Sequence, residues 1–357
     1  MHKKIKLLLT FDYELPLGGC LSYNKGLFEP SERLLELAKD KNIPIVLFAD
    51  ILSVKMFKQW NNDLYVKSFK NQISKAIKQG HDIQLHIHPH WTVSKYKNEQ
   101  FVPVRKFKLG DFKDFEGDGN IEAIISESID LMYELCLETN PDYKCIAYRG
   151  GGYNLRPETD RIFKALYDKG IRIDSTIVKG LYSKSDLRNE DYRNMPNLSN
   201  WFIDLEGNLG KTSKNGMLEI PVTTMPVFPN YRVERMYKKI KSKKLYKKLA
   251  YNHTGKGFAF HTDNFMDKLK NAYFAPLVLS FDNLTTNIKN LEGILNYSLK
   301  KYKHEDEIIL CANSHPKAFG EHQYKLMSDF IDVVQRKYNN VIQFTTYREI
   351  YDERNLR

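Results

Sequence analysis

Short apolar segments alternate with amphipathic segments along this chain. From 121 to 135, isoleucine, methionine and leucine recur at three- and four-residue spacing, which predicts an amphipathic helix. Two other helical patterns end at Gly80 and Gly170, as helices commonly do. Because strands that alternate with helices form parallel sheets, the pattern predicts an α/β fold, either a barrel or a doubly wound sheet. The expected strands are 5–11, 43–48, the segment after Gly80, 145–148, 171–173, 218–222, 277–281, 308–312 and 341–344, and the expected helices lie around 34–38 and at 65–79, 121–135, 156–169 and 323–338.

The chain has no internal repeat and no low-complexity linker, which favours a single domain over 1–357. The stretches 183–216 and 222–264 lack clean periodicity, and we interpret them as loop-rich insertions into that domain. Hydrophobic residues make up 42% of the 357 positions, which is enough to bury a large core.

No segment has the character of a membrane span. Mean hydropathy is −0.52, and no apolar run approaches the roughly 18 residues that a spanning helix needs. At the N-terminus, Asp12 and Glu14 interrupt the apolar stretch before a signal-peptide core forms. The cysteines, which show no paired spacing, are Cys20, Cys136, Cys145 and Cys311. We therefore expect a cytoplasmic protein with reduced thiols.

The net charge of +11 is concentrated in one segment. Between Arg232 and Lys248, nine Lys or Arg residues stand against one acid, Glu234. Such a segment is commonly a solvated helix face, but 232–250 can also lie on an anionic membrane surface or meet a lipid-linked sugar. No recognisable nucleic-acid-binding motif accompanies the basic residues, so no nucleic-acid partner is expected.

Four of the ten histidines fall within ten positions, directly after Gly80. Neutral imidazole is the commonest protein ligand for zinc and similar divalent metals, so this cluster predicts a metal site. His86 and His90 are four positions apart, which lets both reach one ion from a single turn of chain. The cluster consists of His81, His86, His88 and His90.

Further ionisable residues follow other predicted strands, and sites in α/β folds form at the carboxyl ends of strands. Asp12 and Glu14 are two positions apart, so an extended backbone places both carboxylates on one side. Arg149 can pair with a carboxylate and hold it ionised as a base. His315 is a candidate general acid, and Asp174 is the expected partner that raises its pKa and sets its tautomer.

Together these segments resemble the polysaccharide deacetylases, carbohydrate esterases with a NodB-type domain. The resemblance runs from about Ile5 to Pro316, and the histidine segment is its most specific part. It implies a distorted (β/α)7-type barrel. The matching segments are Thr10-Phe11-Asp12-Tyr13-Glu14, Gly80 to His90, Tyr148 to Tyr153, Asp174-Ser175-Thr176 and Ser314-His315-Pro316.

The resemblance also implies roles for individual residues, carried over by position. One departure from the family pattern is Tyr13, which stands where the family has a metal-binding aspartate. Glu14 is the expected replacement; alternatively Asp12 binds the metal and Glu14 is the base, or His88 completes the metal ligands. The implied roles are catalytic base for Asp12, paired with Arg149, general acid for His315, oriented by Asp174, and metal ligand for His86 and His90.

The activity that the resemblance implies is removal of an N-acetyl or other acyl group from a carbohydrate, in cell-surface polysaccharide or O-antigen biosynthesis. Zinc is the expected metal, although nickel, cobalt or iron also suits two histidines and a carboxylate. Trp91 and Tyr153 are candidates to stack on a sugar ring, with core or lid packing as the equal alternative, and the turn at Gly151 is a candidate to hold the oxyanion. The alternative functions are deformylation of a lipid-linked amino sugar and metal-free sugar binding at a degenerate site.

Overall fold

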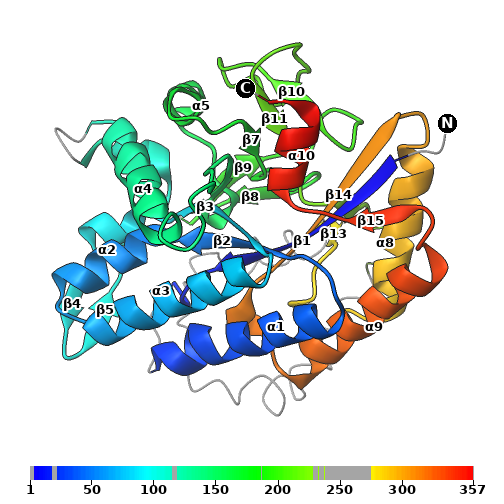
Figure 1. The fold of residues 1–357 in the computed structure, drawn as a ribbon. Coiled ribbons are helices and arrows are strands. Elements are labelled where there is room, and N and C mark those ends of the chain that lie inside the picture. Colours follow the sequence, from blue (N-terminus) through cyan, green and yellow to red (C-terminus); the bar gives the residue numbers. More distant parts are fainter. Residues whose placement is uncertain are drawn as a thin grey trace.

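A nine-stranded sheet forms the centre of the protein in the computed structural model, which describes residues 4–17, 22–114, 119–185, 187–227, 232, 237 and 275–356 (Figure 1). All pairings between its strands are parallel except that of β10 with β11. The strands in spatial order are β10 (Trp201–Ile203), β11 (Met217–Glu219), β7 (Ile173–Asp174), β6 (Ala147–Gly150), β3 (Asp82–Ile87), β2 (Val46–Asp50), β1 (Lys4–Tyr13) and β14 (Glu307–Ser314), and β15 (Ile342–Phe344) also pairs with β1.

The sheet curls into a half-barrel, and the segment after β11 spans the gap between its two sides. Ile220 donates its backbone N–H to Asp174 O on β7 at 2.9 Å, and Thr223 donates its own to Cys311 O on β14 at 2.8 Å. Backbone groups of this one segment therefore pair with strands from both sides of the sheet. The predicted α/β barrel, of a distorted type, is confirmed.

Strand β1 lies inside the sheet, with another strand paired along each of its edges. It pairs with β14 along one edge, while along the other edge β15 covers its first half and β2 covers its second half. Nine of its ten residues are buried, as expected for a strand enclosed by helices in a parallel sheet. The carboxyl end of β1 thus opens at the middle of the sheet edge, between β2 and β14.

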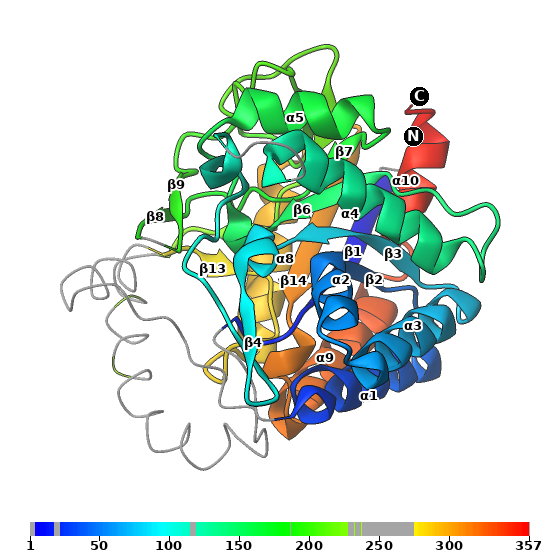
Figure 2. The same ribbon diagram turned by 90° about the vertical axis from the view of Figure 1, so that its left-hand side faces the viewer.

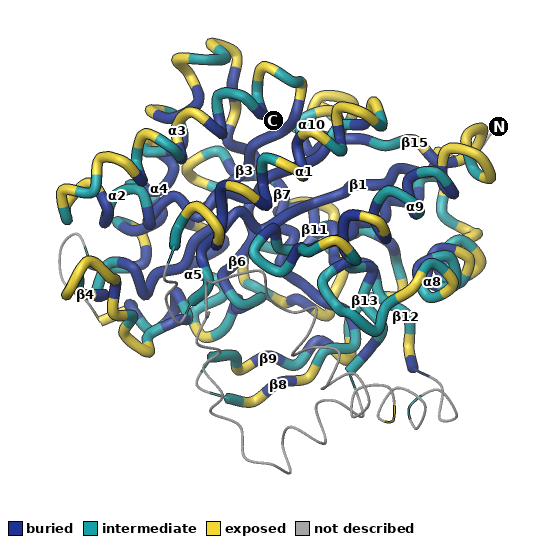
Figure 3. The backbone as a smooth tube through the Cα atoms, turned by 90° about the horizontal axis from the view of Figure 1, so that it is seen from below, coloured by how far each residue is buried: buried dark blue, intermediate teal, exposed yellow. Residues whose placement is uncertain are grey.

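Helices form an outer layer around the sheet, most visibly where α1, α3 and α9 flank it (Figures 1 and 2). Their inward stripes are buried and their outward faces exposed, as Figure 3 shows by colour. The helices are α1 (Glu29–Asp40), α2 (Ile51–Gln59), α3 (Asp63–Lys78), α4 (Ile121–Cys136), α5 (Thr159–Asp168), α8 (Ile288–Lys301), α9 (Glu321–Lys337) and α10 (Tyr347–Arg354). Among the described helices, none is both long and apolar enough to cross a membrane.

Most predicted elements are present, but some elements were missed. Helix α2 begins directly after β2, so its apolar residues extend the apolar run of the strand and hide the change of period. Helices α8 and α10 and the hairpin of β4 (Lys95–Lys97) and β5 (Gln100–Val102) were also missed. The predicted insertion 183–216 holds most of a second hairpin, β8 (Tyr182–Lys184) with β9 (Asn189–Asp191).

The second predicted insertion, 222–264, lies largely outside the described residues. Its described start includes β12 (Thr224–Met225), which pairs with β13 (Leu277–Val278). The basic segment 232–250, with its predicted membrane or lipid-linked partner, falls outside the described residues except for Arg232 and Tyr237.

Candidate active site

The site is built from pairs of residues two positions apart at the ends of three parallel strands. Side chains at such spacing point to the same side of an extended chain, so each strand end delivers two groups to one place. Five of these six residues are buried, with exposed fractions of 4% or less, and the exception is His315, at the rim. The pairs are Asp12 and Glu14 from β1, His86 and His88 from β3, and Asn313 and His315 from β14.

Glu14, His86 and His88 form a candidate metal-binding group. Their donor atoms lie within 4.8 Å of one another. Glu14 Oε2 is 3.2 Å from His86 Nε2 and also contacts His88 Nε2. The Nδ1 of His86 lies 2.8 Å from Arg149 O, and since a carbonyl can only accept, Nδ1 carries the proton and Nε2 is left to face Glu14.

His88, and not His90, therefore lies with Glu14 and His86. The chain stays extended through His88, with φ −106° and ψ 95°, and the 3-10 helix η2 (Pro89–Val93) then turns His90 away. The ring of His90 packs 5.1 Å from that of Trp91 and 5.3 Å from that of Phe107. Neither of its ring nitrogens has a hydrogen-bond partner in the described part of the chain, and burial holds its pKa well below its ordinary value. The sequence prediction paired His86 with His90, four positions apart. In the extended chain, residues two positions apart share a side, so His88 lies beside His86 instead.

Gly151 makes room for the His88 ring. A Cβ at Gly151 would lie 2.6 Å from His88 Nδ1 and 2.6 Å from Ile87 O, distances that no side chain tolerates. This close approach is the reason for a glycine here, so the structure places Gly151 behind a candidate ligand rather than on an open substrate surface.

Trp91 is a buried support and does not present a ring to a substrate. It is 1% exposed, and its Nε1 donates to Asp50 Oδ2 at 2.6 Å. The other oxygen of Asp50 accepts from the backbone N–H of His88 at 3.4 Å. Of the two alternatives stated for Trp91, core packing is correct, because burial leaves no ring face for a sugar.

Asp12 and Arg149 form the ion pair that the sequence predicted. Arg149 Nη1 donates to Asp12 Oδ1 at 2.9 Å, and the guanidinium, fully buried, lies 4.1 Å from the centre of the Phe48 ring. Asn313 Nδ2 donates to Asp12 Oδ2 at 3.1 Å. Burial raises the pKa of Asp12, but Arg149 and His86 lower it further, so this pKa lies well below its usual range and the carboxylate is ionised.

His315 is oriented by Asp282, not by Asp174. Its Nδ1 lies 2.7 Å from Asp282 Oδ2, and its backbone N–H donates to Asp282 Oδ1 at 2.8 Å. The Nε2 of His315 is 3.3 Å from Asp12 Oδ2 and 3.5 Å from Glu14 Oε1. Burial lowers the pKa of His315, but Asp282 and Asp12 raise it to about 10.

The prediction of an Asp174–His315 pair is wrong for a geometric reason. Ser175, the next residue, takes the inward position and accepts from Arg149 Nη2 at 2.9 Å. Since successive residues of an extended chain alternate between faces, Asp174 points away from His315. Its carboxylate accepts instead from Thr176 Oγ1 at 2.7 Å and faces Glu219 on β11.

Three residues of the site were missed in the sequence: Asn313, Asp282 and Lys317. Asp282 follows the predicted strand 277–281, so the strand-end rule that selected Asp12 would also have found it. Lys317, two positions after His315, donates to Glu14 Oε1 at 2.6 Å. Burial raises the pKa of Glu14, but Lys317 and His88 bring it well below its ordinary value, so Glu14 is a second ionised carboxylate.

Tyr153 lies at the edge of the site. Its hydroxyl accepts from Asn313 Nδ2 at 2.8 Å, and Asn313 also contacts Asp12. The residue is half-buried, with φ of +61° in the left-handed region, and burial raises its pKa above the ordinary value. This position beside Asp12 keeps Tyr153 among the candidates for a substrate contact.

No family model matches the chain, and no curated protein matches it. Several solved structures are similar in fold. A protein assigned as a polysaccharide deacetylase from Mycobacterium smegmatis has a TM-score of 0.51 and 12% identity, over 99% of this chain and 91% of that one. GH57 branching enzymes from Thermococcus kodakaraensis and Pyrococcus horikoshii have TM-scores of 0.50 and 12% and 13% identity, over 99% of this chain and 71% and 70% of theirs. The resemblance of the motifs is thereby supported at the level of the fold.

Proposed function

We propose that this protein is a metal-dependent hydrolase that removes an acyl group, N-acetyl in the first instance, from a carbohydrate. One observation carries the proposal: Glu14, His86 and His88 converge between an ionised carboxylate, Asp12, and an oriented imidazole, His315. A ligand set beside a candidate base and a candidate acid is what hydrolysis of an amide requires.

The three converging residues fit a divalent cation. Two imidazoles and a carboxylate are ligands that zinc and neighbouring transition metals accept. The tautomer of His86 is set by a backbone carbonyl, a common support for metal-binding histidines. His88 Nε2 is buried and directed at Glu14 Oε2, so a cation between these two atoms would be bound by both residues. When bound, the ion would supply a water of lowered pKa and polarise the acyl oxygen.

The protein groups divide the proton transfers between them. Asp12, kept ionised by Arg149, is the proposed base that takes a proton from the attacking water. Asn313 holds the same carboxylate from the other side, which fixes the direction of its free lone pairs. His315 donates through Nδ1 to Asp282 and directs Nε2 into the site, so it is the proposed acid that protonates the departing amine. Glu14 contacts both imidazoles, which favours the assignment of Glu14 as ligand and Asp12 as base.

The proposed substrate class is supported by similarity to other proteins, whereas the proposed chemistry is supported by the geometry of the site. The Mycobacterium smegmatis neighbour is assigned as a polysaccharide deacetylase, and the motifs resemble the same family. We therefore propose an N-acylated amino sugar as substrate and cell-surface polysaccharide or O-antigen biosynthesis as the setting. Removal of formyl instead of acetyl uses the same residues and is distinguished by the acid that is released.

The test combines metal analysis with an assay of acid release. Purified protein is expected to hold about one equivalent of a transition metal and to release acetate from N-acetylglucosamine oligomers. His86→Ala is expected to lose both properties. His304→Ala, which removes an exposed histidine before the start of β14, at the opposite end of that strand from His315, is the matched control and is expected to keep them. Full acetate release by His86→Ala would exclude the proposal.

A further inference from the structure

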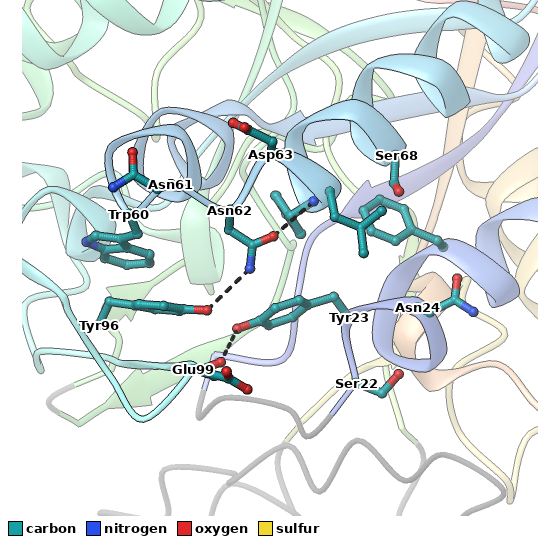
Figure 4. A pocket seen from close by; sticks show the side chains of 13 residues that line it. Ser22, Tyr23, Asn24, Trp60, Asn61, Asn62, Asp63, Ser68, Tyr96 and Glu99 are labelled. Atoms are coloured by element: carbon teal, nitrogen blue, oxygen red, sulfur yellow. Dashed lines mark hydrogen bonds between the residues drawn. The ribbon is translucent and has the colours of Figure 1, made fainter.

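A groove separate from the candidate active site lies on the surface of the protein. It has a volume of about 1010 Å³ and lies where the π-helix η1 (Asn24–Phe28), the start of α3 and the β4–β5 hairpin meet (Figure 4). None of the residues assigned above to the candidate active site lines it. The groove is therefore not explained by the proposed hydrolysis.

Aromatic rings and amides line this groove together. Trp60 and Tyr96 stack face to face, with ring centres 5.1 Å apart and an angle of 15° between their planes, and both are half-buried. Tyr65, stacked on Phe57 at 4.0 Å, lies deeper. The small polar residues of the lining are Ser22, Asn24, Asn61, Asn62 and Ser68. Flat apolar faces beside amides and hydroxyls match a sugar ring, which has one apolar face and a rim of hydroxyl groups.

Hydrogen bonds hold the walls of the groove in place. Asn62 caps α3 by accepting from the backbone N–H of Tyr65 at 3.1 Å, and its amide also donates to the Tyr96 hydroxyl at 3.3 Å. The Tyr23 hydroxyl, from the segment before η1, donates to Glu99 O in the turn of the hairpin at 3.2 Å (Figure 4). A ligand that enters such a preformed groove loses less free energy in ordering the side chains around it.

The charge of the groove narrows the class of ligand. The lining includes two exposed acids, Asp63 and Glu99, and no lysine or arginine among its described members. An anionic chain would meet repulsion there, whereas a neutral or cationic chain would not. The aromatic rings and amides favour sugars, and among sugars those with a free amine are cationic.

We propose that this groove binds a carbohydrate chain without acidic groups, and that it prefers amino sugars whose amines are free. Trp60 and Tyr96 supply the stacking surface, and Asp63 and Glu99 attract the ammonium groups. The hairpin that carries Tyr96 follows η2, and η2 follows His88 directly, so the groove and the site share one continuous segment. The sugar class is argued from the lining alone. The use of the groove to hold a polymer that has been deacylated at Glu14 and its neighbours rests on the proposed function.

The test measures the binding of defined sugar hexamers by calorimetry and by tryptophan fluorescence. Trp91 and Trp201 are buried, so a fluorescence change reports mainly on Trp60. We expect the glucosamine hexamer to bind more tightly than the N-acetylglucosamine hexamer, and the galacturonate hexamer not to bind. Trp60→Ala is expected to weaken both interactions about tenfold or more, the loss of one well-packed ring contact. Tyr182→Ala, which removes an exposed tyrosine outside the groove, is the control and is expected to bind as the wild type does.

Asp63→Asn keeps the test decisive if Trp60→Ala does not fold. Because Asp63 is exposed, this variant is expected to fold, to bind the glucosamine hexamer about threefold more weakly and to bind the N-acetylated hexamer unchanged. Equal affinity of wild type and Trp60→Ala, binding of the galacturonate hexamer in preference to the others, or no binding of any hexamer would each overturn the proposal. Binding by chelator-treated protein is expected to persist, so failure of the hydrolase proposal leaves this result unchanged.

Discussion

Two pairs of buried residues lie at strand ends of the same sheet, and the pKa values of their acids are shifted in opposite directions. In the Asp12–Arg149 pair, a guanidinium 2.9 Å away holds the pKa of the carboxyl well below its usual range. In the Asp174–Glu219 pair, two carboxyls face each other across β7 and β11, and within the described residues neither forms an ion pair with lysine or arginine. Burial raises the pKa of both acids, and Asp174 raises that of Glu219 further.

The difference shows that burial alone does not decide the charge of an acid in this barrel. All four residues are essentially inaccessible to solvent, so desolvation opposes every charge. A cation in contact reverses that effect for Asp12, whereas burial is not offset for Asp174 and Glu219, and the pKa of both is raised. The acids with lowered pKa lie with the histidines, and the pair with raised pKa lies apart from them.

The largest expected effect follows from removing the cation of the ionised pair. Arg149→Met leaves Asp12 buried without its guanidinium partner, with only Asn313 and His315 beside it, which is expected to lower the free energy of unfolding by about 3–5 kcal/mol. The double variant Asp12→Asn with Arg149→Met removes the stranded charge and is expected to regain most of that stability without regaining activity. Urea unfolding measures both. A single variant as stable as the double one would show that the pair is not what keeps Asp12 charged.

The next effect separates two neighbouring histidines. His88→Ala is expected to lose bound metal and to lower acyl release at least about a hundredfold, because even loss of a residue that only supports a ligand costs 10- to 100-fold. His90→Ala removes a ring of the same kind two positions away and is expected to retain the metal, with a loss of stability from its cavity. Metal analysis of the two variants side by side gives the answer. Metal loss in His90→Ala with retention in His88→Ala would restore the sequence assignment.

This contrast also shows how far the sequence could lead. The position of the site was predictable, because Asp12, Arg149 and His315 each follow an apolar run and the ends of parallel strands meet at one edge. The choice among the histidines was not, because it depends on where extended chain gives way to helix. That change comes at Pro89, one residue after His88 and one before His90, and no periodicity marks a change so short.

Contacts between distant segments were the other limit. Trp91 and Asp50 meet only because β2 and β3 pair in the observed register, so the burial of Trp91 could not be seen from its own neighbours. The Asp282–His315 contact likewise joins two loops, whereas Asp174 was favoured only by its place in the chain order of the motifs. The local pattern of apolar residues was enough to predict the fold class. To predict which side chains contact Trp91 or His315, the register of the strands is also needed.

A smaller effect compares two aspartates, one from each region. Asp282→Asn keeps the shape of the side chain but removes the negative charge beside His315 Nδ1, which helps to raise the pKa of that histidine. It is expected to lower kcat about 10- to 100-fold with KM changed less than about twofold, because it acts on proton transfer and not on binding. Asp174→Asn, within the pair of raised pKa, is expected to leave both constants near the wild-type values. Steady-state kinetics of the two variants decides between Asp282 and Asp174 as the positioning residue of His315.

The smallest effect tests, by pH, the raised pKa of Glu219 in the second pair. Because the pKa of Glu219 is raised in the folded protein, the folded state binds more protons than the unfolded state above the ordinary pKa of about 4.5, and stability must fall as pH rises from there toward the folded pKa. Glu219→Gln replaces the acid by a neutral amide of the same shape, which does not titrate. It is expected to reduce the decline by about 1.4 kcal/mol for each pH unit in that window, so the variant becomes the more stable protein in alkaline buffer. Urea unfolding at a series of pH values measures the two slopes, and parallel slopes would mean that the pKa of Glu219 is not raised in the folded protein.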